Sequence, residues 1–386
     1  MKKIGIITLH FSINYGAVLQ CAALIKKMES LGNKAEAIDY VPEYLERYWK
    51  SWKSPIYVCK CQKAYCGKNV LKTFVKLSKA FWRTLWENRN YIERKKKENK
   101  FEDFKKKYIP LSRVRFSTAA ELNAGQFDYD CMITGSDQVW NPTFTNNKFD
   151  EAYFLNFGTS HSKKIAYAAS AGISGNEAFY KQLVENTKNL DAISVREKSL
   201  AEEMQKAGAK NVVSVIDPTL FLTGSEWEEL ETPKEGINEK YILIYCLAQH
   251  EEFVRILDKL HSRMELKIID ISPKGVQGDY IWKHDTTCGP DEFLWYIHHA
   301  ELVLTNSFHG TVFSVLYEKK FITVADEKTG SRMKDLLYEI HLDDRLYSNE
   351  KAFDDYLLNS DFTKAFEAIK DQREIAEHFL IDNMGE

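Results

Sequence analysis

A histidine near the start of a predicted helix is the residue of this chain best placed to do chemistry. In the stretch LVLTNSFHGTVFSVL, the apolar residues 302–304 predict a buried strand and the polar residues 305–307 predict the cap of a following helix. His309 then falls in the first helical turn, where backbone N–H groups have no partner inside the helix and the dipole is positive. Gly310 has no Cβ, so a ligand can approach the backbone closely. The pattern predicts a seat for a phosphate or carboxylate, and a structural histidine that caps its own helix fits the same residues.

A second candidate is the motif GSDQVWNP at 135–142, which follows another buried apolar run. A Gly-Ser-Asp turn at the carboxyl end of a strand is where open α/β sheets bind ligands. Asp137 is therefore a candidate general base, and Trp140, two residues after Gln138, has a ring that can stack on a sugar. An Asx-type turn beside a core tryptophan fits the same motif.

Two further positions lie where predicted strands end. Arg196 follows a short apolar run and precedes a helix, so it faces the ligand crevice if the sheet is parallel. An ordinary ion pair with Glu197 is the alternative. Asn14, Tyr15 and Gly16 lie at the first strand–helix crossing. Only Gly16 stands where a dinucleotide fingerprint needs three glycines, so the sequence does not predict a dinucleotide site.

The elements that must position these residues alternate between short apolar strands and helices, the pattern of an α/β protein with parallel sheets. We expect two Rossmann-like domains, over residues 1–222 and 241–360. The polar segment 223–240, rich in turn-forming residues, is the expected linker. The last segment, 361–386, is expected to form a helix that packs back on the first domain.

The span 47–107 differs in character from the rest of the chain. It carries 19 Lys or Arg against 5 Asp or Glu, a net charge of +14 in a chain whose total is −3. Aromatic residues are interleaved with the basic ones, and we interpret the span as a helical insertion in the first domain. Solvated helix faces around a small local core explain this composition. Peripheral contact with an anionic membrane explains it as well, and would use Trp49, Trp52, Trp82, Trp86 and the lysines at 95–97 and 105–107.

Composition argues against several classes of protein. The small net charge gives no global argument for nucleic-acid binding. No stretch approaches the roughly 18 apolar residues of a membrane-spanning helix, and the N-terminal run is typical of a core strand rather than a signal peptide. Seven cysteines, an odd number, argue against a disulfide framework and for a cytoplasmic location. No metal site is predicted, because Cys59, Cys61 and Cys66 lack a matching Cys or His pair.

Five motifs, taken in order, resemble those of the polysaccharide pyruvyl transferase family. They are NYGAVLQ at 14–20, GSDQVWNP at 135–142, SVREKS at 194–199, DPTL at 217–220 and TNSFHGTVFS at 305–314. The resemblance implies a fold like that of the GT-B glycosyltransferases, in which two Rossmann-like domains face each other across a cleft. It also implies that the first domain holds the acceptor and the second domain the donor.

The resemblance implies roles for individual residues. His309 matches the family's catalytic histidine, and Arg196 matches its arginine at the carboxyl end of a strand. Many members have an arginine where this chain has Ser307, so a cationic donor contact is missing or is supplied by Arg332. Gly310 completes the expected donor side. The expected acceptor side consists of Asn14, Tyr15, Gly16, Gln138 and Trp140.

The implied activity moves the enolpyruvyl unit of phosphoenolpyruvate onto two hydroxyls of a sugar, giving a pyruvate ketal in a cell-surface polysaccharide or its precursor. His309 would protonate the methylene carbon and Asp137 would take the acceptor proton, without a cofactor. The acceptor is a glycan or a lipid-linked sugar. Two alternatives remain open: a GT-B glycosyltransferase that uses a nucleotide sugar, and a non-catalytic carbohydrate-binding or assembly protein.

Overall fold

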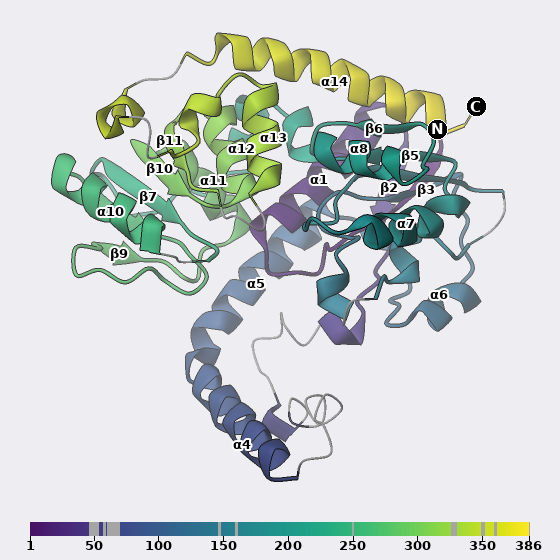
Figure 1. Cartoon of the computed structure of the whole chain (residues 1–386), viewed down its shortest axis with the longest axis horizontal. Coiled ribbons are helices and arrows are strands. Elements are labelled where there is room, and N and C mark those ends of the chain that lie inside the picture. The colour runs from purple at the N-terminus through teal and green to yellow at the C-terminus, as the bar shows by residue number, and fades with distance from the viewer. Residues whose placement is uncertain are drawn as a thin grey trace.

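Two parallel β-sheets, one in each half of the chain, form the framework of the molecule (Figure 1). The structure is a computed structural model and describes residues 1–45, 54–56, 59, 70–145, 148–158, 161–248, 251–325, 330–348, 352–358 and 361–385. The expected fold class is confirmed: the chain is an α/β protein with two Rossmann-like halves and a helical basic insertion in the first.

The first sheet has six strands in the order β2-β1-β3-β4-β5-β6, all parallel. Because β1 pairs with both β2 and β3, the strand order reverses there, and such a switch point is where open sheets bind ligands. The strands are β1 (Lys3–Ile7), β2 (Lys34–Ala37), β3 (Cys131–Thr134), β4 (Lys163–Ala169), β5 (Ala192–Val195) and β6 (Val212–Ser214).

The second sheet has five parallel strands in the order β11-β10-β7-β8-β9. Strands β7 and β10 are buried along their whole length, as expected for strands covered on both faces. The strands are β7 (Tyr241–Tyr245), β8 (Lys267–Asp270), β9 (Lys283–His284), β10 (Leu302–Thr305) and β11 (Lys320–Thr323).

Helices connect the strands of each sheet. In the first half they are α1 (Tyr15–Ser30), α4 (Val70–Glu87), α5 (Tyr91–Tyr108), α6 (Ala119–Ala124), α7 (Glu177–Asn186) and α8 (Lys198–Lys206). In the second half they are α9 (Gly224–Glu228), α10 (Glu251–Arg263), α11 (Pro290–His298), α12 (Phe308–Leu316), α13 (Ser331–Glu339) and α14 (Thr363–Asn383). All residues of α12 are buried, because its sequence apart from His309 is apolar or small on every side.

One apolar core runs across the junction of the two halves. Tyr15 at the start of α1 stacks on Phe293 of α11, with ring centroids 4.4 Å apart, and its hydroxyl donates to the carbonyl oxygen of Cys288 at 3.0 Å. On the other side of the junction, the Ser199 hydroxyl donates to the Asp335 carboxylate at 2.7 Å. A junction this apolar holds the two halves in a fixed relation, because opening it would expose the core.

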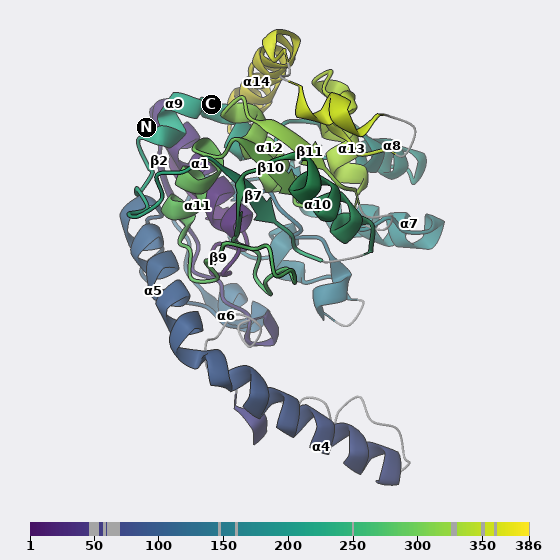
Figure 2. The same cartoon turned by 90° about the vertical axis from the view of Figure 1, so that its left-hand side faces the viewer.

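Helix α14 leaves the second half and lies along the first (Figures 1 and 2). The Arg373 guanidinium donates to the carbonyl oxygen of Leu222 at 3.0 Å, and Glu377 pairs with Lys27 of α1 at 2.6 Å. No helix among the described residues is both long and apolar enough to cross a membrane.

Candidate active site

Two helices, one from each half of the molecule, begin at the same place. The Asn14 side chain caps α1 by accepting from the N–H of Ala17, and the Ser307 hydroxyl oxygen caps α12 by accepting from the N–H of Gly310, both at 3.3 Å. His309 lies in the first turn of α12 and packs on Gly16 in the first turn of α1, where a Cβ atom would stand 1.8 Å from its Nδ1. The positive ends of two helix dipoles therefore converge on one buried imidazole.

Asp217 is the carboxylate around which the polar groups of the site gather. Its Oδ2 accepts from Nη1 of Arg196 and from the Ser136 hydroxyl, each at 2.9 Å, and lies 3.6 Å from Nε2 of His309. Burial disfavours the charged carboxylate. The positive charges of His309 and Arg196 outweigh this and hold the pKa of Asp217 well below its usual range. Asp217 is therefore an anion at every physiological pH and attracts a positive charge on the imidazole.

Arg196 is held on three sides in the first half of the site. Besides Asp217, its Nε lies 3.3 Å from Glu197, and the guanidinium carbon stands 4.3 Å from the ring centroid of Phe308, across the junction. Burial lowers the pKa of Arg196, but the two carboxylates raise it above its ordinary value, so it stays charged. Its Nη2 is buried without a hydrogen-bond partner.

Arg332, at the start of α13, brings a second guanidinium to the site from the other half. Burial lowers its pKa, and repulsion by the positive charge of Arg196 lowers it further. Its Nε is also buried without a partner. With Glu197 and the loop 171–175, Arg332 lines a hollow of about 300 Å³ between the two halves. Each of the two arginines therefore has a buried N–H group available to donate to an anion.

Asp137 lies at the edge of the same site, with a backbone φ of 72°. This left-handed conformation is uncommon outside glycine, and strained residues gather at functional sites. Its carboxylate is buried and its charge acts on both Arg196 and Arg332. The structure thus brings together five residues predicted from the sequence: Gly16, Asp137, Arg196, His309 and Arg332.

Two residues expected on the donor side have structural duties instead. The Ser307 hydroxyl is used as the cap of α12, and the residue is buried. A Cβ atom on Gly310 would stand 2.4 Å from Oγ1 of Thr305, so this glycine gives space to a neighbouring strand residue rather than to a ligand.

The acceptor side needs correction, because two of its aromatic residues belong to the core. Trp140 is 1% exposed, stacks on Phe154 and donates its indole N–H to the carbonyl oxygen of Tyr153 at 2.9 Å. The expectation that its ring stacks on a sugar is therefore wrong. Tyr15 is equally buried in the junction. Gln138 accepts from the Asn141 side chain at 2.8 Å.

Asp217 is a site residue that the sequence did not predict, although it opens the motif DPTL. An aspartate before proline reads first as a helix cap, and this one does accept from the N–H of Thr219 at 3.0 Å. That signal concerns only one of its oxygens. The other oxygen, Oδ2, contacts Arg196, Ser136 and His309, which lie in other segments of the chain.

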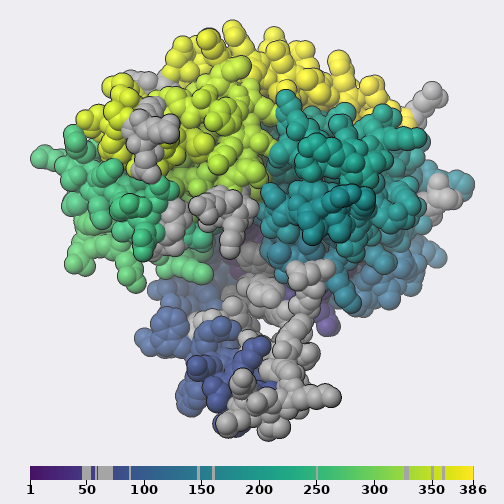
Figure 3. All heavy atoms as spheres, in the orientation of Figure 1, coloured from purple at the N-terminus to yellow at the C-terminus, as the bar shows by residue number. Residues whose placement is uncertain are grey.

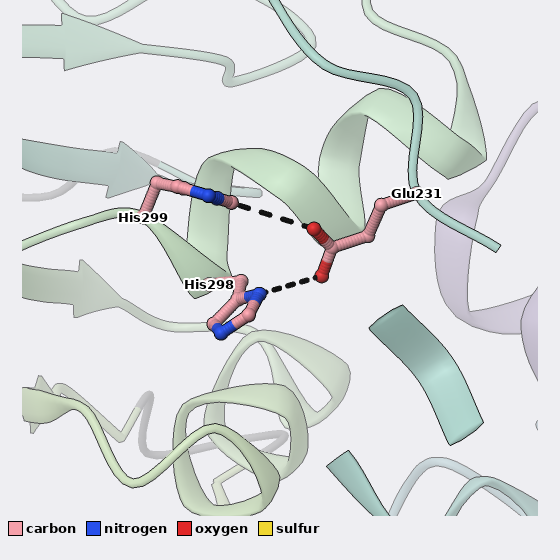
Figure 4. A group of neighbouring side chains, drawn as sticks. All are labelled: Glu231, His298 and His299. Carbon is pink, nitrogen blue, oxygen red and sulfur yellow. Dashed lines mark hydrogen bonds and ion pairs between the residues drawn. The ribbon is translucent and has the colours of Figure 1, made fainter. Parts of the chain in front are cut away.

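One cluster among the described residues has the side chains of a metal site. Glu231, His298 and His299 bring their ligand atoms within 4.8 Å of one another (Figure 4). However, Nδ1 of His298 lies 3.0 Å from the Glu231 carboxylate and Nδ1 of His299 lies 3.0 Å from the Trp295 carbonyl oxygen. Both nitrogens are thus already engaged as hydrogen-bond donors. Of the three cysteines weighed as ligands, Cys61 and Cys66 lie outside the described residues.

Solved structures with a similar course of chain include a UDP-GlcNAc 2-epimerase from Neisseria meningitidis bound to UDP-GlcNAc, at 9% identity and TM-score 0.45, covering 99% of this chain and 100% of that one. A putative UDP-N-acetylglucosamine 2-epimerase from Listeria monocytogenes matches at 10% identity and TM-score 0.42, covering 97% and 90%. A search of curated proteins finds no match.

The sequence model of one family, described as polysaccharide pyruvyl transferase, matches residues 14–327. This range contains all five motifs, and it includes Gly16, Asp137, Arg196, Asp217 and His309. Because the match covers most of the chain, the protein is a transferase that belongs to the polysaccharide pyruvyl transferase family.

Proposed function

We propose that this protein transfers the enolpyruvyl unit of phosphoenolpyruvate to two hydroxyls of one sugar in a cell-surface polysaccharide or its precursor. The observation that carries the proposal is a pair of buried arginine nitrogens without hydrogen-bond partners, Nη2 of Arg196 and Nε of Arg332. Beside them lies the imidazole of His309, whose Nε2 is 3.6 Å from Asp217. Phosphoenolpyruvate carries a carboxylate and a phosphate, and both need charged donors when they leave water. The converging starts of α1 and α12 add backbone dipoles of the same sign.

The reaction starts with proton transfer to carbon. His309 protonates the methylene carbon, the double-bond electrons form the new C–H bond, and the central carbon becomes an oxygen-stabilised cation. A sugar hydroxyl attacks this cation, and Asp137 takes the hydroxyl proton. The C–O bond to phosphate then breaks, its electrons leave with the phosphate, and a second hydroxyl attacks and gives its proton to the departing phosphate. One donor and one diol become one ketal and one phosphate, so atoms and electrons balance.

The acceptor side of this proposal is a hollow of about 170 Å³ at the carboxyl ends of β1 and β2. Its lining includes His10, Phe11 and Asp39 from the first domain and Glu98 and Glu102 from α5. Carboxylates, an imidazole and an aromatic ring are the groups that bind sugar hydroxyls and ring faces. The loop that lines this hollow leads directly to α1, whose first turn contacts His309.

The experiment has two stages. In a thermal-shift assay, phosphoenolpyruvate should raise the Tm of the full chain. The increase in Tm should be smaller for Arg332→Gln. Arg263→Gln is the matched control, because Arg263 is exposed on α10 and pairs with Asp354. Phosphate release from phosphoenolpyruvate, with a panel of free and nucleotide-linked sugars as acceptors, then identifies the acceptor. The ketal methyl group is detected by NMR.

If a nucleotide sugar raises the Tm of the wild type and phosphoenolpyruvate does not, the protein is a glycosyltransferase and this proposal is wrong. Failure of every donor to release phosphate would favour a non-catalytic binding protein. We also propose that the reaction takes place in the cytoplasm, because seven cysteines, an odd number, argue against a disulfide framework.

A further inference from the structure

A helical arm projects from the first half of the molecule (Figures 1 and 2). It consists of α4, the short turn Asn88–Asn90 and the first part of α5. The second part of α5 is anchored, since Phe101 and Phe104 are buried in the core and Lys100 pairs with Glu292 at 2.7 Å. The arm therefore extends from a fixed base, and its atoms reach beyond the two halves in the space-filling view (Figure 3).

Large apolar side chains are exposed along this arm. Phe74 and Trp82 are each 69% exposed, Trp86 is 66% exposed and Ile92 is 69% exposed. Positions 74, 82 and 86 differ by multiples of four, so they share one side of α4. Elsewhere in the described chain, the exposed tryptophan is Trp282, at 38%. An exposed stripe of this size, on a helix with a buried opposite face at Ala80 and Thr84, marks an interaction surface.

The charge of the arm identifies the partner. Residues 70–96 hold eight Lys or Arg against two Glu, a net of +6, while the chain as a whole is at −3. The remaining residues therefore carry a net of −9, so an anionic surface attracts the arm and repels the rest of the molecule. Two such arms repel each other, which disfavours a second copy as the partner. Tryptophan rings beside lysines are typical of helices that lie in the headgroup region of a membrane.

We propose that the arm docks on an anionic lipid bilayer, with Phe74, Trp82 and Trp86 in the headgroup region and the surrounding lysines facing lipid phosphates. The contact is peripheral. It does not depend on which donor the cleft binds, so it stands or falls apart from the proposed reaction. Trp49 and Trp52 lie outside the described residues. Of the lysines first assigned to the contact, Lys97 and Lys105 are buried at the base of the arm and do not take part.

The test is cosedimentation of the full chain with vesicles of phosphatidylcholine alone or with added phosphatidylglycerol, at low and high salt. We expect binding to the anionic vesicles only, weakened by salt. The double variant Trp82→Ala/Trp86→Ala and the triple variant Lys76→Gln/Lys79→Gln/Lys96→Gln should each bind on the order of 100-fold more weakly. The first removes the rings placed in the headgroup region, and the second removes three of the cations attracted to lipid phosphates. Trp282→Ala, on the second half, is the matched control and should bind like the wild type.

Circular dichroism and Tm show whether each variant is folded, and the salt and lipid dependence of the wild type needs no variant. Equal binding to both vesicle types, or none to either, overturns the proposal. So does unchanged binding of a folded arm variant. Reversible self-association that the tryptophan variant abolishes would assign the stripe to a second copy instead.

Discussion

A Cβ atom on Gly16 would lie 1.8 Å from Nδ1 of His309, so the glycine of one half leaves the space that the imidazole of the other half fills. The first domain thus sets the position of a side chain that belongs to the second. Neither half alone contains the site, because Asp217 and Arg196 come from the first half and His309 and Arg332 from the second.

Replacing Gly16 should therefore impair turnover more than folding. In Gly16→Ala the new methyl group displaces the imidazole, and displacement of a catalytic group by about 1 Å costs on the order of 100-fold in kcat. The measurement is kcat and Tm side by side. Gly208→Ala is the control: a Cβ there meets nothing within 4 Å but adopts a φ of 103°, so it should lower Tm and leave kcat unchanged. Equal kcat in both variants would show that His309 is not positioned by Gly16.

Asp217 should make the stability of the protein depend on pH in the acid range. The folded pKa of this carboxyl lies well below its unfolded value of about 3.9, so its stabilisation is complete above about pH 5 and is lost as the pH falls further. Asp217→Asn removes the anion from a buried cluster and should cost about 3–5 kcal/mol near pH 7. Chemical denaturation at pH 7 and pH 3 measures both values. The difference between variant and wild type should shrink at pH 3, and a constant difference would contradict the assigned charge pairing.

Local sequence signals predicted the parts of the site that local structure creates. The cap before His309 and the strand end before Arg196 can be recognised from neighbouring residues alone, because capping and strand burial involve only a few consecutive positions. The alternation of strands and helices predicted the fold class for the same reason. The resemblance added the expectation that these separate segments lie together at a cleft between two domains.

The missed or misplaced residues depend on contacts between distant segments. Asp217 is a helix cap by local signal, yet its partners Ser136 and His309 are 81 and 92 residues away in the chain. Trp140 is an aromatic residue beside a polar turn, and only the packing of Phe154 against it shows that it is internal. The spacing of apolar residues along the chain does not show whether an aromatic ring packs in the core or lines a binding site.

Trp140 should contribute to stability rather than to acceptor binding, because it is packed inside the core. Trp140→Phe keeps an aromatic ring but leaves the Tyr153 carbonyl oxygen without the indole N–H, which should cost about 1–3 kcal/mol of unfolding free energy. The KM for the acceptor should not change. Asp39→Asn, in the proposed acceptor hollow, is the comparison and should raise that KM with little change in Tm. A raised acceptor KM in Trp140→Phe would return the residue to the binding site.

A buried lysine at the base of the arm should make the stability of the protein depend on pH in the alkaline range. Lys97 lies at the junction with its Nζ 4.5 Å from the ring centroid of Tyr15, and burial lowers its pKa to about 8, against the opposing attraction of Asp285. Near pH 7 this lysine is charged in both the folded and unfolded states, and the folded state bears the cost of burying the charge. As the pH rises above 8, the folded protein loses the proton while the unfolded chain keeps it up to about pH 10.4, so stability should increase.

Lys97→Met keeps a long unbranched side chain without the charge and should therefore raise the free energy of unfolding at pH 7 by about 3 kcal/mol, less what the contact with Tyr15 contributes. The difference in the free energy of unfolding should become smaller between pH 8 and pH 10, because Lys97 of the folded wild type then loses its charge, which the variant never carries. Lys106→Met is the matched control, since Lys106 is exposed on the same helix and its pair with Asp103, 3.8 Å apart, lies in solvent. Denaturation curves at pH 7, 8.5 and 10 measure the difference in the free energy of unfolding between variant and wild type. The prediction is wrong if the variant is less stable than the wild type at pH 7, or if the difference does not change with pH. Either result would mean that the surroundings stabilise the buried ammonium and that its charge helps to hold the base of the arm.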